Sequence, residues 1–89
     1  MIQVIVGKQG TGKTKTLIGM ANGMVELSKG EIVFITNETR RMLELDHQVR
    51  LIKPYEFSIK GLKQFYAFLS GIIAANYDIE QIYIDGLLE

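Results

Sequence analysis

The stretch Gly7-Lys8-Gln9-Gly10-Thr11-Gly12-Lys13-Thr14 decides the fold, because it separates an apolar run at 2–6 from a helical pattern at 13–28. Its spacing, G-x-x-x-x-G-K-[ST], is that of a phosphate-binding loop, which lies between a strand and a helix. The glycines leave main-chain N–H groups accessible to an anion, and the start of the helix directs further N–H groups at it. The sequence therefore predicts a polyphosphate site.

The side chains of this loop have separate expected roles. Lys13 is expected to bridge the β- and γ-phosphates and to stabilise transition-state charge, and the Thr14 hydroxyl to hold Mg²⁺. The expected nucleotide contacts are Lys8, Gln9, Gly10, Thr11, Gly12, Lys13 and Thr14. The alternative is a glycine-rich turn that has this spacing by accident.

Size and composition limit the function classes. The 89 residues predict one small domain, 1–89, with an ordinary globular composition of 47% hydrophobic and 22% charged residues. A net charge of +0 gives no basic field for nucleic acid or an anionic membrane, and no apolar run is long enough to span a bilayer. The absence of cysteine and of a signal-peptide pattern predicts a cytoplasmic protein.

Strand and helix patterns alternate along the chain. Apolar runs at 2–6, 31–36, 49–53 and 81–85 predict strands, the first buried at the centre of a sheet and the third an edge strand, parallel or antiparallel. Helices are predicted over 13–28 and from Ser58, as N-cap, to residue 75. The predicted fold is α/β, a three-layer sandwich with a mainly parallel sheet of about four strands. It is small for its kind, so it is a minimal version of the fold, or strands are missing beyond Glu89, or a partner covers one sheet edge.

Asp85 provides the second half of the predicted site. It ends the apolar run 82–84, so it is expected at the carboxyl edge of the sheet, where the phosphate-binding loop also opens. There it is expected to hold Mg²⁺ opposite Thr14. The alternative is an Asp that only ends a strand or a turn.

Together these motifs resemble the P-loop NTPase superfamily, with Walker A at 7–14 and Walker B at 82–85. The chain is also similar to small bacterial ATP-binding proteins that are labelled as twitching-motility-ATPase-like, a label that implies superfamily membership and not a pilus motor. The resemblance implies a nucleotide partner, with Mg²⁺ and ATP or another NTP bound.

Two positions depart from the superfamily pattern. Many P-loop ATPases have a catalytic Glu directly after the Walker B Asp, and this chain has Gly86, which leaves Glu38 or Glu89 as substitutes. Lys8 resembles the extra lysine that reaches across a dimer in the partitioning ATPases, although Gln9 interrupts that motif. The alternative is a solvated loop lysine.

Three functions follow. The first is a small Mg-dependent ATP-binding protein with slow hydrolysis, in which Lys13 and Glu38 are the catalytic candidates. The second is a nucleoside or nucleotide kinase. The third is a non-catalytic nucleotide-sensing module that acts through a homodimer or an unknown protein partner. In each, the polar stretch 37–41 could act as a phosphate sensor, a switch or an arginine finger. The alternative is a solvated turn between elements.

Overall fold

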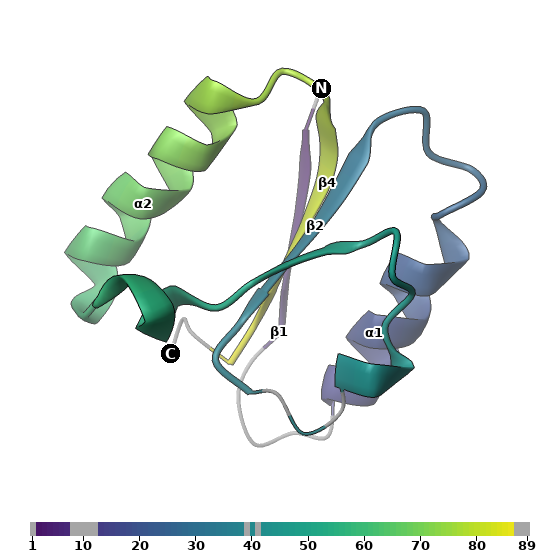
Figure 1. Cartoon of the computed structure of the whole chain (residues 1–89), viewed down its shortest axis with the longest axis horizontal. Coiled ribbons are helices and arrows are strands. Elements are labelled where there is room, and N and C mark those ends of the chain that lie inside the picture. The colour runs from purple at the N-terminus through teal and green to yellow at the C-terminus, as the bar shows by residue number, and fades with distance from the viewer. Residues whose placement is uncertain (1, 8–12, 39, 41, 87–89) are drawn as a thin grey trace.

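The computed structural model describes residues 2–7, 13–38, 40 and 42–86. Within them, four strands form one sheet in the order β1-β4-β2-β3, and all neighbouring pairs are parallel. Two helices and two short 3₁₀ segments connect the strands (Figure 1). In chain order the elements are β1 (Gln3–Gly7), α1 (Lys13–Gly23), β2 (Glu31–Thr36), η1 (Met42–Glu44), β3 (Arg50–Ile52), η2 (Pro54–Phe57), α2 (Gly61–Ala75) and β4 (Ile79–Asp85). The α/β class and the parallel sheet are confirmed.

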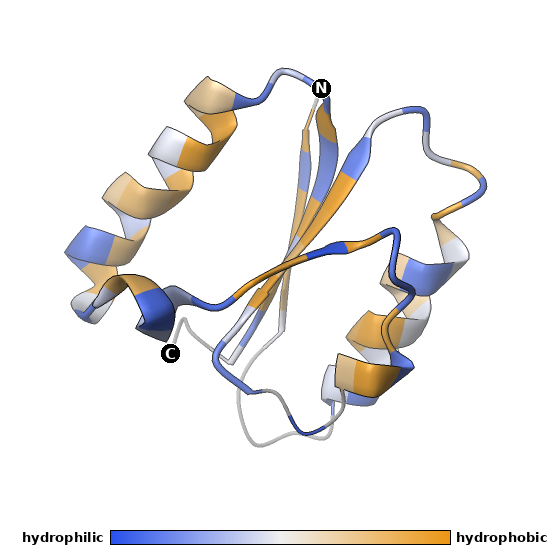
Figure 2. Ribbon diagram, viewed as in Figure 1, coloured by the Kyte–Doolittle hydropathy of each residue, from blue (hydrophilic) through white to orange (hydrophobic). Residues whose placement is uncertain are grey.

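The helices α1 and α2 lie on opposite sides of the sheet (Figure 1). Because successive strand residues point to opposite faces, β2 serves two cores. Ile32 and Phe34 join the core under α1, whereas Val33 and Ile35 join the core under α2. Both faces of β2 are therefore apolar, and most of the strand is orange in Figure 2.

The first strand does not lie where the sequence predicts. β1 pairs only with β4, so it is an edge strand, and β4 and β2 are the central strands. Val4 and Val6 each keep 47% of their surface exposed. The prediction of a fully buried central strand at 2–6 is wrong, because an apolar, β-branched run is compatible with either position.

The helix boundaries also differ from the expected ones. Ser58 does not cap α2, because it has a left-handed φ of 58° and closes η2, and α2 begins three residues later at Gly61. α1 ends at Gly23, and the hydrogen-bonded turns that follow it carry the chain to Ser28. These turns still pack Met24 and Val25 against the core, so the apolar spacing continues beyond the helix.

The connection from β2 to β3 crosses the α1 face of the sheet. Asn22 of α1 holds this connection with two side-chain hydrogen bonds of 2.7 Å, donating to Glu44 O and accepting from Asp46 N. Met42 and Leu45 pack against the core beside α1. β3 is therefore a parallel edge strand, which resolves the orientation that the sequence left open.

The opposite face has less cover, because α2 is its one helix in the described residues. A helix about 10 Å wide covers about two strands spaced about 4.8 Å apart. Phe65 is the one buried residue of α2, and Leu62 and Tyr66 are 69% and 71% exposed. The flanks of α2, over the two outer strands, are consequently left open in part.

No helix in the described part of the chain combines the length and apolar character needed to cross a membrane.

A chain of polar side chains links β4 to β1 under α1. The Tyr83 hydroxyl donates to Gln81 Oε1 at 2.7 Å, and Gln81 Nε2 donates to Gln3 Oε1 at 2.9 Å. Tyr83 is almost wholly buried, and this burial raises the pKa of its phenol above the usual value of 10.0.

The raised pKa of Tyr83 predicts a loss of stability in alkali. The unfolded chain ionises Tyr83 first, so the free energy of unfolding should fall as the pH rises above about 10. In an ultraviolet-absorbance titration, one of the four tyrosines should ionise after the others. Tyr83→Phe should remove that late component, whereas Tyr77→Phe, at an exposed position, should leave it in place. Simultaneous ionisation of all four would contradict this assignment.

Candidate functional site

The carboxyl ends of three strands meet beside the start of α1. In the strand registers, Asp85 of β4 lies between Gly7 of β1 and Thr36 of β2. All three residues are buried and form one row across the sheet. Parallel strands place the ends of segments that are far apart in sequence at one edge, and this edge is the usual ligand position in open α/β sheets.

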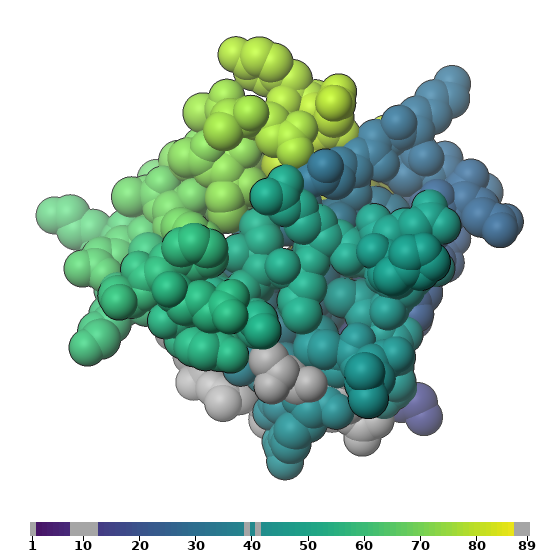
Figure 3. Space-filling model, in the orientation of Figure 1, coloured from purple at the N-terminus to yellow at the C-terminus, as the bar shows by residue number. Residues whose placement is uncertain are grey.

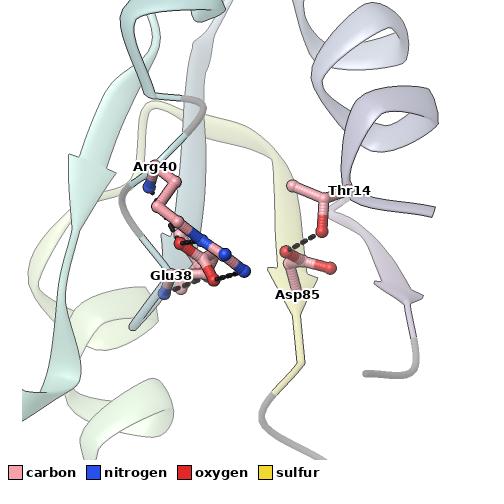
Figure 4. A network of polar contacts seen from close by, with 5 residues as sticks. Thr14, Glu38, Arg40 and Asp85 are labelled. Carbon is pink, nitrogen blue, oxygen red and sulfur yellow. Dashed lines mark hydrogen bonds and ion pairs between the residues drawn. The ribbon is translucent and has the colours of Figure 1, made fainter. Parts of the chain in front are cut away.

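Thr14 and Asp85 are in direct contact at this edge (Figure 4). The Thr14 hydroxyl donates a hydrogen bond of 2.8 Å to Asp85 Oδ2, across 71 positions of sequence. Asp85 is only 3% exposed, whereas Thr14 is half-buried on the first turn of α1. The structure thus brings together the two residues that the sequence assigned to a metal ion.

The start of α1 has the charge pattern of an anion-binding helix end. Lys13 is the first helical residue and is exposed, and the first turn contains no acidic residue. The unpaired N–H groups and the positive end of the helix dipole add to the lysine charge. An anion beside Asp85 would therefore meet several donors and a cation.

Part of the predicted site lies outside the described residues. This applies to Lys8, Gln9, Gly10, Thr11 and Gly12, and also to Arg41 and Glu89.

The Thr14–Asp85 pair fits a hard cation better than a soft one, because both side chains offer oxygen. Among the described residues, no three His, Cys, Asp or Glu side chains lie together as a metal site. Mg²⁺ is commonly held by one or two carboxylates together with substrate phosphates and water. The donor set therefore fits Mg²⁺ that arrives with a polyphosphate, and does not form a protein-only metal cage.

The local backbone explains why a glycine follows Asp85. Gly86 has a left-handed φ of 69°, and its N–H donates to Gly7 O at 3.0 Å. A glutamate at this position would be strained, because side chains disfavour that region of φ. Gly7 is constrained differently, since a Cβ there would overlap Leu17 Cδ1 of α1. Here glycine permits α1 to pack closely against the end of β1.

Glu38 and Arg40, in the segment that follows β2, form a charged pair (Figure 4). Glu38 N donates to the buried Thr36 Oγ1 at 2.9 Å, which holds the start of this segment against β2. Arg40 donates from its Nε and Nη2 to the two Glu38 oxygens at 3.0 and 2.9 Å. These hydrogen bonds, followed by charge attraction to Glu38, raise the pKa of the Arg40 guanidinium above its usual value. The Glu38 carboxylate is thus engaged by Arg40.

Two polar anchors at this edge explain how the segment after β2 is placed. Thr36 is wholly buried and was not identified from the sequence, although a hydroxyl at the end of an apolar strand is a usable signal. Asn37 Oδ1 accepts from Tyr55 N at 2.9 Å, which connects β2 to η2. Asn37 therefore has a structural contact. His47 is exposed beside Asp46, and the described residues contain no group of His, Cys, Asp or Glu side chains that could hold a metal ion with it.

Comparisons of the chain with models of known protein families, with curated proteins and with solved structures found no match.

The packing at Gly7 gives a stability prediction. Gly7→Ala should destabilise the fold by about 1–3 kcal/mol, the usual cost of overpacking, because the new methyl group overlaps buried Leu17. Gly19→Ala is the matched control, since a Cβ there has open space, and it should stabilise α1 by up to about 1 kcal/mol. Urea denaturation measures both. A Gly7→Ala protein as stable as the wild type would show that α1 does not pack this closely on the end of β1.

Proposed function

We propose that this chain is a small P-loop-type protein that binds Mg-ATP, or another Mg-NTP, and hydrolyses it slowly. The observation that carries the proposal is the 2.8 Å contact between Thr14 and buried Asp85 at the N-terminus of α1. The phosphate-loop spacing of 7–14 directly precedes this helix. A hydroxyl, a carboxylate and a lysine beside a helix N-terminus match the needs of a magnesium polyphosphate.

Each residue of the proposed site has one role. Lys13 would bind the β- and γ-phosphate oxygens and offset the charge that builds up on them during transfer. Thr14 would offer its hydroxyl to the metal ion, and Asp85 its carboxylate, directly or through water. Mg²⁺, when bound, neutralises phosphate charge. The amides of the stretch 8–12 would complete the phosphate contacts.

Slow turnover follows from the residue after Asp85. Gly86 has no side chain to orient an attacking water, and its left-handed φ of 69° disfavours a glutamate there. Glu38 is the remaining carboxylate of the described edge, and in this structure its oxygens accept from Arg40. Phosphoryl transfer depends mainly on positioning, so binding requires less of the site than hydrolysis does.

Substitution of Lys13 tests the nucleotide site. Lys13→Ala should reduce Mg-ATP affinity by at least about tenfold, because charge-assisted hydrogen bonds are worth about 1.5–3 kcal/mol. Isothermal titration calorimetry measures the affinity. Lys15→Ala is the matched control, because Lys15 is also exposed, two positions further along α1. This variant should leave the affinity nearly unchanged.

Both Lys13 and Lys15 are exposed, so neither variant should lose stability in a thermal melt. A folded Lys13→Ala protein with wild-type affinity for Mg-ATP would contradict the assignment.

A second candidate function, the nucleotide-sensing module, is favoured by the open edge of β1. Val4 and Val6 are in register with Ile82 and Ile84, so they lie on the α2 face. No charged residue, proline or bulge protects β1, and such features usually discourage edge-to-edge pairing. A partner strand could pair with β1 and cover its exposed valines. The kinase alternative has no such supporting observation in the described residues.

The two candidates differ in what Mg-ATP does. A sensing module should form a larger species with Mg-ATP, measured by size-exclusion chromatography with light scattering, without releasing phosphate. Val6→Lys should prevent this association, whereas Leu27→Lys, at an exposed position outside the sheet, should not. A wild-type chain that stays monomeric and releases phosphate would rule out the module and favour the enzyme.

A further inference from the structure

A second concave site lies on the α2 face, between α2 and the edge strand β3. It is a groove of about 570 Å³. Its apolar walls come from β2, β3, β4 and α2. Its polar end is formed by Glu31, Arg50 and Asn76, near the amino edge of the sheet. The lining residues are Glu31, Val33, Arg50, Ile52, Ala67, Phe68, Gly71, Ile72, Ala75, Asn76 and Ile79. Because Asp85 and Thr36 end their strands, this polar end lies at the opposite edge from the phosphate site.

Small residues of α2 keep the groove open. Ala67, Gly71 and Ala75 recur every fourth position, so they lie along one line of the helix, facing the groove. A Cβ at Gly71 would have no heavy atom within 4 Å. Packing therefore does not require a glycine here, and a glycine inside a helix is destabilising relative to alanine. A larger apolar residue at this position would enter that open space.

The polar end of the groove presents hydrogen-bond donors. Arg50 is in register with Val33, which places its side chain on the α2 face beside the groove. Glu31 Oε1 accepts from Asn76 Nδ2 at 3.0 Å and lies 3.5 Å from Arg50 Nη1. Glu31 thus orients two donors, and the Arg50 side chain remains 63% exposed with further N–H groups for a ligand.

We propose that this groove binds a small amphipathic anion, an aliphatic or aromatic carboxylic acid whose carboxylate lies at Arg50. The apolar body would lie along Ala67, Gly71 and Ile52, and Asn76 would offer a second donor to the head group. The groove volume falls in the range of about 300–1,000 Å³ that is typical of small-molecule sites. An apolar groove with a few polar groups at one end is the usual form of such a site.

The proposed position of the ligand's apolar body is tested by filling the groove with a larger side chain. Decanoate and 2-naphthoate serve as aliphatic and aromatic probes, titrated into ¹⁵N-labelled protein and followed by NMR chemical-shift changes. At least one probe should bind saturably and shift the amides of Gly71 and Ile52. Gly71→Leu should weaken that probe at least tenfold. Gly19→Leu, on the other face and also with open space at its Cβ, should bind as the wild type does.

The head group is tested by removing its donor. Arg50→Gln should weaken carboxylate binding by about twofold to fivefold, as expected for a partly exposed charge pair, and should leave binding of decanol unchanged. The probe that binds more tightly identifies the body as aliphatic or aromatic. The proposal would be overturned if a folded Gly71→Leu protein bound the probe as tightly as the wild type. It would also be overturned if Arg50→Gln weakened the binding of decanol and decanoate equally, or if neither probe gave a saturable chemical-shift change. The nucleotide site can fail its own test without affecting this result.

Discussion

The hydrogen bond between Thr14 Oγ1 and Asp85 Oδ2 depends on how the two ends of the described chain are joined. Parallel pairing of β1 with β4 sets Gly7 beside Asp85, and the bond from Gly86 N to Gly7 O holds the two strand ends in register. α1 then starts next to the same point. If β1 paired elsewhere, the carboxylate and the helix start would not meet, and the proposed site would not exist.

This junction places the carboxylate of Asp85 in a position that is almost wholly buried. Burying a carboxylate is unfavourable unless donors or cations compensate. Thr14 provides one hydrogen bond to Asp85, and the start of α1 contributes the positive end of its dipole. In the proposed function a magnesium ion and the adjacent lysine would add positive charge beside the same carboxylate. A bound cation would therefore stabilise the folded protein by offsetting the negative charge of buried Asp85.

The sequence predicts the strands and the Thr14–Asp85 pair better than it predicts their surroundings. Both residues end or begin elements at the carboxyl edge of a parallel sheet, so their proximity follows from the alternation of strands and helices. The edge position of β1 does not follow, because its apolar run resembles that of a central strand. The position of Ser58 in η2 and not at the N-cap of α2 depends on the turn that Pro54 begins.

Contacts that depend on how the strands and helices pack in three dimensions could not be predicted from the sequence. The pairing of Glu38 with Arg40 requires the turn that Thr36 anchors, and the closeness of Gly7 to Leu17 requires the packing of α1 on β1. The groove beside α2 arises because one helix covers a face made by four strands. The sequence shows the small residues Ala67, Gly71 and Ala75, but only the position of β3 makes them the wall of a groove.

The most direct measurement of the central claim is the affinity for ATP with and without Mg²⁺, by calorimetry, in the wild type and in Asp85→Asn. Asp78→Asn, at an exposed position near the other end of β4, is the control. The account predicts that Mg²⁺ tightens ATP binding in the wild type and the control, and that Asp85→Asn loses most of this gain while it still folds. A folded Asp85→Asn protein that keeps the full gain from Mg²⁺, or a wild type that binds no ATP, would contradict the account.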